Sequence, residues 1–457
     1  MTTKTPLLLA AVVLLFSIVA PAQSATDLAA FNGLAPVSAL QNTTAGQAAL
    51  AANYAVTGGI QTGKLRQPTL LPLAEQRQQA LRDAAITGGD LAQLADGLGT
   101  ALGAAYLAKA HYKDSSHFTN ISPAVASLIA YANASTGGNS NAAKFFFANA
   151  TSNGKIPVSD QARTILQRVH GVTDVFGKSY GFPAGSTGAN PYGNSRPFQT
   201  EPTTATITGL DYFNVPTENT AYNRGPMMNL VASPSFPSGH TTYGYTGALL
   251  LAILVPERYQ QMVARGAEYG NDRILMGSHY AMDVLAGRTL ALYGLAHLLA
   301  NDPAYVGQRL YGGTTPIMDF PAAIQRARAD MAVALEAGCA RSVQKCARED
   351  KSRFKKPAAD QTFYAVTQTY DLPVVFPQTA QSVEQVGVLA PEAGNLLTAA
   401  FPSLTLDQAD QILTDTEGPG GGFLDNGSGF GVYSRLNLYA AAGKAAALAA
   451  ATHSSAR

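Results

Sequence analysis

Apolar residues recur at three- and four-residue spacing through much of the chain, the pattern of helices that bury one face. Over residues 73–110 this pattern predicts two helices separated by a turn at Gly88-Gly89, with Asp90 as the N-cap of the second. Another helix is predicted over residues 123–134, ended by the pair Gly137-Gly138. Further helices are predicted over residues 159–175, 241–254, 256–276, 279–300 and 321–337. Strand-like alternation is scarce, so the fold class is mainly α.

The remaining segments lack such periodicity and are rich in small residues. Residues 26–70 predict an irregular N-terminal arm, and residues 177–198 are dense in Gly and Pro, which predicts a long loop. After residue 337 the Gly-rich sequence predicts a C-terminal extension of mixed secondary structure. We therefore expect an N-terminal helical region over 26–160, a catalytic core over 161–300 and an extension over 301–457 whose role the sequence leaves open.

The first 25 residues have the layout of a signal peptide. Lys4 gives a positive start, residues 7–20 form an apolar run, and small residues follow at 20–22, with cleavage expected between Ala22 and Ala25. A retained anchor is the alternative, although the run is shorter than the roughly 20 residues that a span requires. No later segment predicts a span. We expect a secreted or periplasmic protein without a membrane anchor after cleavage.

Net charge and cysteine content exclude some classes of partner and metal site. Lys and Arg total 31 against 30 Asp and Glu, a net charge of +1, so the chain lacks the basic surplus that nucleic-acid binding requires. The two cysteines, Cys339 and Cys346, can pair after export. On one unbroken helix they would be about 10 Å apart, so a disulfide requires a turn between them. Two thiols without a nearby His do not predict a zinc site.

Three short polar segments carry the candidate chemistry: Arg196-Pro197, then Pro237-Ser238-Gly239-His240, then Arg273 with His279 and Asp283. A helix N-terminus at Ser238 would present free N–H groups to an anion, and Gly239 would let the backbone approach it. His279 and Asp283 are four residues apart, so on a helix they share a face. A carboxylate there would fix the imidazole tautomer and favour a nucleophilic ring nitrogen.

The order of these segments resembles the signature of the phosphatidic acid phosphatase type 2 superfamily, which includes vanadium haloperoxidases and bacterial class A non-specific acid phosphatases. The likeness covers residues 170 to 300 and is continuous with the acid phosphatases from Ser235 to Arg288. It implies a helical bundle and the hydrolysis of small phosphate esters through a phosphohistidine, without a cofactor or metal.

The resemblance also implies a role for each residue. His279 would be the nucleophile, Asp283 its orienting carboxylate and His240 the general acid. Phosphate would be bound by the Arg196 and Arg273 side chains, with Ser238 and Gly239 completing the cradle. The sequence departs from the family at Ala189, where a lysine is usual, and Lys178 is the nearest upstream substitute. It also carries Asp272 where the family usually has serine.

Three alternatives to a secreted acid phosphatase follow from the same residues. A vanadium-dependent haloperoxidase would use the same cradle to bind vanadate. A lipid phosphatase at a membrane surface would be expected to carry a basic amphipathic helix, which the sequence lacks. A binding protein with an inactive site is disfavoured by the presence of both histidines and Asp283. The natural substrate and the oligomeric state stay open.

Overall fold

The computed structural model describes residues 23–65, 70–201, 204–310 and 314–455. It is mainly helical, as predicted, and the described residues contain one antiparallel pair of short strands, β1 (Thr208–Leu210) and β2 (Pro216–Glu218). The N-terminal half contains α1 (Ala25–Leu34), α2 (Ala39–Asn42), α3 (Thr44–Thr62), α4 (Leu73–Ala84), α5 (Thr100–Leu107), α6 (Pro123–Asn149), α7 (Asp160–Arg168), α8 (Val175–Ser179), α9 (Pro197–Thr200) and α10 (Asn219–Asn223).

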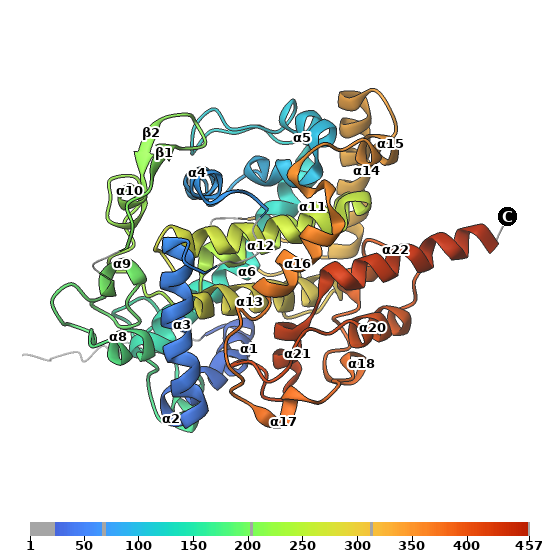
Figure 1. Ribbon diagram of the computed structural model, residues 1–457. Coiled ribbons are helices and arrows are strands. Elements are labelled where there is room, and N and C mark those ends of the chain that lie inside the picture. Colours follow the sequence, from blue (N-terminus) through green and yellow to red (C-terminus); the bar gives the residue numbers. More distant parts are fainter. Residues whose placement is uncertain (1–22, 66–69, 202–203, 311–313, 456–457) are drawn as a thin grey trace, which may run out of the picture.

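Three helices form the centre of the molecule: α11 (Gly239–Leu254), α12 (Tyr259–Leu275) and α13 (Ala281–Leu299) (Figure 1). Helix α11 is buried from Thr241 to Leu254, and α13 is almost completely buried. Helices that are apolar on all sides must be enclosed by others, and α6 packs against both of them. The polar N-termini of α11 and α13 therefore lie inside the protein.

The C-terminal segment packs onto this centre and contains α14 (Phe320–Cys339), α15 (Val343–Arg348), α16 (Pro357–Thr367), α17 (Pro377–Ala380), α18 (Val386–Leu389), α19 (Asn395–Thr398), α20 (Leu406–Asp415), α21 (Gly429–Arg435) and α22 (Leu438–Ser455). Helices α16 and α22 contact α12, while α19 and α21 contact α13. The end of α22 projects away from the body (Figure 1). The expectation of a mixed extension was wrong, because its described residues form helices and loops without a strand.

Three local predictions were also wrong. Residues 26–70 are not an irregular arm, since α1 to α3 cover most of its described part; their weak amphipathicity hid helices that tertiary packing stabilises. Helix α6 does not end at Gly137-Gly138 but continues to Asn149. Asp90 does not cap a helix N-terminus: it is buried, its carboxylate accepts the Tyr106 hydroxyl, and the next helical turn is capped by Leu91.

Two predictions about export can be compared with the fold. Cys339 and Cys346 form the expected disulfide, with Cα atoms 6.6 Å apart, because α14 ends at Cys339 and Ala340 adopts a left-handed conformation before α15. The proposed signal peptide lies almost entirely outside the described residues. Among the helices that the structure describes, none is long and apolar enough to cross a bilayer.

Candidate active site

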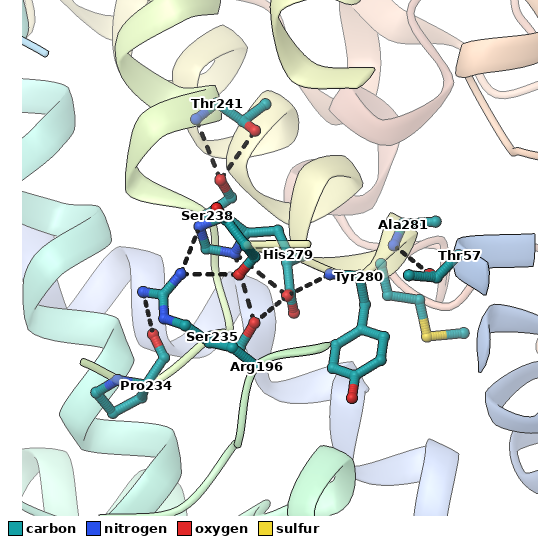
Figure 2. Close-up of polar contacts among 12 residues, drawn as sticks. Thr57, Arg196, Pro234, Ser235, Ser238, Thr241, His279, Tyr280 and Ala281 are labelled. Atoms are coloured by element: carbon teal, nitrogen blue, oxygen red, sulfur yellow. Dashed lines mark hydrogen bonds and ion pairs between the residues drawn. The ribbon is translucent and has the colours of Figure 1, made fainter. Parts of the chain in front are cut away.

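The three polar segments meet at the buried ends of α9, α11 and α13. Arg196 is the N-cap residue of α9, Ser238 that of α11, and His279 immediately precedes the Tyr280 cap of α13. Figure 2 shows Arg196, Ser235 and Ser238 gathered around His279. Residues more than 80 positions apart in the chain are thus brought into one cluster, as the sequence predicts.

The Arg196 guanidinium is held on every side. Its Nε donates to the Ser233 carbonyl over 2.7 Å, and Nη2 donates to Ser233 Oγ and the Pro234 carbonyl, each over 3.1 Å. Its Nη1 donates to the Ser278 carbonyl and to Nε2 of His279, both over 2.9 Å. A fully buried guanidinium with this many fixed contacts is preorganised to bind an oxyanion.

The contacts of His279 assign its tautomer. Its Nδ1 lies 3.3 Å from Oδ2 of Asp283, and the same carboxylate oxygen accepts the Tyr280 N–H over 2.9 Å and the Ser235 hydroxyl. Because the acceptor-only carboxylate faces Nδ1, that nitrogen carries the proton. Nε2 then keeps its lone pair, and this lone pair points toward Arg196, where an anion would bind.

The start of α11 contributes a second histidine. Ser238 Oγ accepts the Thr241 N–H over 3.1 Å, so its oxygen caps the helix while its own hydrogen stays available to a ligand. His240 follows two residues later and is half-buried, with its ring centroid 6.2 Å from that of His279. The two imidazoles are therefore neighbours, and one phosphoryl group beside them can contact both.

Arg273 reaches the cluster from the last turn of α12. Its Nη2 donates to the Ala80 carbonyl over 3.1 Å, and its guanidinium stacks on the Tyr269 ring with 4.9 Å to the centroid. The neighbouring Asp272 is buried, where desolvation and the charges of Asp83 and Glu268 raise its pKa well above the usual range. The elevated pKa favours the uncharged carboxyl, so Asp272 adds little negative charge beside Arg273.

Lys144 completes the cluster of cations, whereas Lys178 does not join it. Lys178 is exposed on α8 and lines a separate surface hollow with Tyr54 and His170. Lys144, on the buried face of α6, is 7% exposed and has no hydrogen-bond or ion-pair partner among the described residues. Its Nζ lies 3.1 Å from the position that a Cβ on Gly239 would occupy. A side chain at residue 239 would therefore crowd the ammonium group.

The electrostatics of the cluster favour neutral histidines and an incoming anion. Burial lowers the pKa of His279 well below its usual range, and the nearby charges of Arg196, His240, Lys144 and Arg273 lower it further. Burial, followed by Arg273, Lys144 and Arg196, does the same to the pKa of His240. Bound phosphate would oppose both shifts by neutralising the cations.

Two groups in the cluster titrate near neutrality. Burial raises the pKa of Asp283 to about 7 against the hydrogen bonds from Ser235 and Tyr280. Burial and the charge of Arg196 lower the pKa of Lys144 to about 7, although Asp283 acts in the opposite direction. The charge balance of the site therefore changes across the range from mildly acidic to neutral.

Part of the chain is similar to known proteins. A family model described as the PAP2 superfamily matches residues 190–303. A non-specific acid phosphatase of Salmonella typhimurium is 45% identical over 64 residues, which are 14% of this chain and 26% of the relative. An acid phosphatase of Zymomonas mobilis is 44% identical over 64 residues, covering 14% and 24%. A non-specific acid phosphatase of Providencia stuartii is 40% identical over 67 residues, covering 15% and 27%.

The chain spans about a quarter of the length of the curated relatives it matches. The matched family segment contains Arg196, Ser238, His240, Arg273, His279 and Asp283. Lys144 lies outside it, and sequence reasoning missed this residue. The one available signal was a lone lysine directly before the apolar run Phe145–Phe147, but nothing in the sequence places that run beside His240.

Proposed function

Because residues 190–303 form a PAP2 superfamily domain, we propose that the protein is an acid phosphatase that hydrolyses phosphomonoesters through a phosphohistidine. The observation that carries the proposal is the convergence of three cationic side chains on the space beside Nε2 of His279. Arg196, Arg273 and Lys144 balance the charge of a phosphoryl group, whose transfer chiefly requires positioning and positive electrostatics. The names of the acid phosphatases from Salmonella, Zymomonas and Providencia support the same reaction.

In the first step, the Nε2 lone pair of His279 attacks phosphorus. The N–P bond forms while the bond from phosphorus to the ester oxygen breaks, and His240 gives its proton to the departing oxygen. Positive charge develops on the His279 imidazolium, and Asp283 opposite Nδ1 stabilises it. The Arg196 guanidinium exchanges its contact with Nε2 for contacts with the phosphoryl oxygens.

In the second step, water attacks the phosphohistidine. His240, now neutral, accepts a proton from the water as the new O–P bond forms. The N–P bond breaks, its electron pair returns to Nε2, and phosphate leaves. The cycle restores both histidines to their starting states.

The proton that His240 donates must arrive with the substrate. Burial and three nearby cations keep His240 neutral in the empty site. A phosphomonoester monoanion has its own proton to share, since its second pKa is about 6. A monoanion beside neutral His240 is equivalent to a dianion beside protonated His240, so the reaction favours the acidic to neutral side.

Export to the periplasm or the medium is part of the same proposal. It rests on the arrangement of Lys4, the apolar run at residues 7–20 and the small residues that follow, and the Cys339–Cys346 disulfide is compatible with an oxidising compartment. N-terminal sequencing of the mature protein should find a start between residues 23 and 26. Recovery of an intact N-terminus in the membrane fraction would contradict export by cleavage.

The direct test is hydrolysis of p-nitrophenyl phosphate by the purified full-length protein. We expect turnover that vanadate inhibits strongly, because vanadate adopts the trigonal-bipyramidal geometry of the transition state. A chelator should leave the rate unchanged. Absence of hydrolysis, together with peroxide-dependent bromide oxidation after vanadate is added, would instead identify a haloperoxidase.

A further inference from the structure

A cavity of about 620 Å³ opens beside the candidate catalytic residues. One of its walls is a single face of α6, formed by Asn133, Gly137, Gly138, Asn141 and Lys144, and His240 borders its inner end. The volume falls within the roughly 300 to 1,000 Å³ that small-molecule sites occupy. Since His240 would protonate the departing oxygen, the leaving group of a substrate must extend into this cavity.

The face of α6 sets the length of the cavity. Asn133 and Lys144 are eleven residues apart, which is roughly 16 Å along the axis at 1.5 Å per residue. Lys144 lies at the phosphoryl end, beside Gly239. Asn141 Oδ1 lies 3.5 Å from the position that a Cβ on Gly239 would occupy, so the phosphoryl end is level with Asn141. Gly137 and Gly138 precede Asn141 on the helix and lie roughly 5 to 6 Å farther out along the axis, at the limit of a two-carbon leaving group and within the reach of a six-membered ring.

The glycine pair occupies helix positions where glycine is unfavourable. Gly137 and Gly138 lie in the middle of the 27-residue helix α6, where glycine is destabilising relative to alanine. Neither has a positive φ, so backbone conformation does not require glycine. No atom lies within 4 Å of the position that a Cβ would occupy at either residue. The missing side chains therefore leave open space in the cavity wall.

Apart from Lys144 and His240 at the inner end, the rest of the lining is uncharged and mixes polar groups with apolar ones such as Ala134 and Met228. The side-chain oxygen and nitrogen of Asn133 are buried and have no hydrogen-bond partner among the described residues. Asn141 and Thr87 add further hydrogen-bonding groups, and the Tyr243 ring adds an apolar surface. Among the described residues that line the cavity, none is acidic. Such a lining suits hydroxyl groups on a ring and offers nothing to a cationic leaving group.

We propose that this cavity binds the leaving group of the substrate, that the Gly137-Gly138 pair sets how large a group it accepts, and that the preferred substrates are phosphomonoesters of polyhydroxylated rings such as hexoses. The proposal rests on the proposed phosphatase function. Asn133 and Asn141 would recognise the hydroxyl groups. The glycine pair would leave enough space for a leaving group as large as a hexose.

The test of size compares glucose 6-phosphate with ethyl phosphate in the variants Gly137→Leu and Gly138→Leu. We expect kcat/KM for glucose 6-phosphate to fall at least tenfold relative to that for ethyl phosphate, because leucine fills the outer part of the cavity. Gly58→Leu is the matched control. Gly58 is also a glycine inside a helix with no atom within 4 Å of its Cβ position, but it lies on α3 and does not line the cavity.

The test of hydroxyl recognition uses Asn133→Ala and a third substrate, cyclohexylmethyl phosphate, which has the ring without the hydroxyl groups. The variant should raise KM for glucose 6-phosphate several-fold and leave KM for the other two esters unchanged. An equal effect on all three would overturn the role of Asn133. Wild-type preference for cyclohexylmethyl phosphate over glucose 6-phosphate would overturn the substrate class.

A binding measurement separates this proposal from the phosphatase function. In a His279→Ala background, calorimetry should show tighter binding of glucose 6-phosphate than of ethyl phosphate, and Gly137→Leu or Gly138→Leu should remove the difference. If the difference persists in both folded glycine variants, the cavity assignment is wrong even when the wild type is an active phosphatase. If the wild type hydrolyses no ester but these binding differences appear, the phosphatase function fails and the cavity assignment stands.

Discussion

The two sides of the candidate active site, here called its walls, differ in how firmly their polar groups are held. On the wall formed by the ends of α9, α11 and α13, Arg196 and Asp283 are fixed by several hydrogen bonds each. On the wall formed by α6, Lys144 and the Asn133 side chain have no partner among the described residues. On the first wall, Arg196 and Asp283 are held without a ligand, although Oδ1 of Asp283 has no partner among the described residues. The second wall offers unpaired groups to a ligand.

This difference matches a division of labour. A preorganised wall costs no rearrangement during the reaction and is suited to stabilising a transition state. A wall with unsatisfied groups and open space is suited to selecting the leaving group. We therefore expect substitutions on the first wall to reduce the rate most. Substitutions on α6 should mainly change substrate preference.

The largest expected effect separates the two histidines of the site. His279→Ala should abolish hydrolysis of every ester, because it removes the nucleophile. His240→Ala should cost about 10² to 10⁴ in rate for alkyl phosphates and much less for p-nitrophenyl phosphate, whose leaving group needs little protonation. Steady-state rates on both esters measure the difference. Equal losses on both esters in His240→Ala would contradict its role as the general acid.

Asp283→Asn is expected to reduce kcat by about 10³ to 10⁴. The amide can present its N–H groups to Nδ1 of His279 and so favour a proton on Nε2, where the nucleophilic lone pair should be. Circular dichroism and thermal unfolding would establish that the variant folds. A folded variant with a nearly normal rate would show that this carboxylate does not orient the nucleophile.

Lys144 and Lys178 give a matched pair for the α6 wall. Lys144→Met should lower kcat/KM by about 10² to 10³, the usual cost of losing one donor to the transition-state oxyanion, and should weaken vanadate inhibition. Lys178→Met should stay within twofold of the wild type, since Lys178 lies on a separate surface hollow. A large loss in Lys178→Met with a nearly normal Lys144→Met would instead show that Lys178 takes the role of the missing family lysine.

The pH dependence of kcat/KM tests the charges of both walls together. As pH rises, ionisation of Asp283, with a pKa of about 7, increases activity. Over the same range, loss of the substrate proton near pH 6 and of the Lys144 proton near pH 7 decreases activity. We expect a bell-shaped profile with its maximum between about pH 6 and 7. A flat profile from pH 4 to 9 would contradict the assignment.

The smallest effect on activity is expected far from both walls, at the disulfide. Replacing Cys339 and Cys346 by serine should lower the free energy of unfolding by about 2 kcal/mol, because the bond closes only a short loop. Activity at 25 °C should be unchanged. Thermal unfolding of the folded variant, followed by its kcat, measures both quantities. A loss of activity without a loss of stability would mean that α14 and α15 influence the site.

The sequence predicted the first wall well and the second poorly, for a physical reason. His279 and Asp283 are one helical turn apart, and Ser238 lies beside Gly239 and His240, so local spacing alone brings these groups together. Lys144 reaches the site only because α6 packs against α11 and α13, and no spacing along the chain encodes that contact. Gly137-Gly138 misled the prediction of α6 because glycine usually ends helices, whereas here the pair opens a cavity.

The position of the phosphoryl group on the enzyme tests the account most directly. Rapid quenching of the wild type during turnover, followed by peptide mapping at alkaline pH, where phosphohistidine survives, would locate the label, and ³¹P NMR would distinguish the two ring nitrogens. The contacts of Asp283 and Arg196 with His279 predict phosphorylation of Nε2 of His279. Phosphorylation of Nδ1, of His240 or of any other residue would contradict the assignment of nucleophile and tautomer.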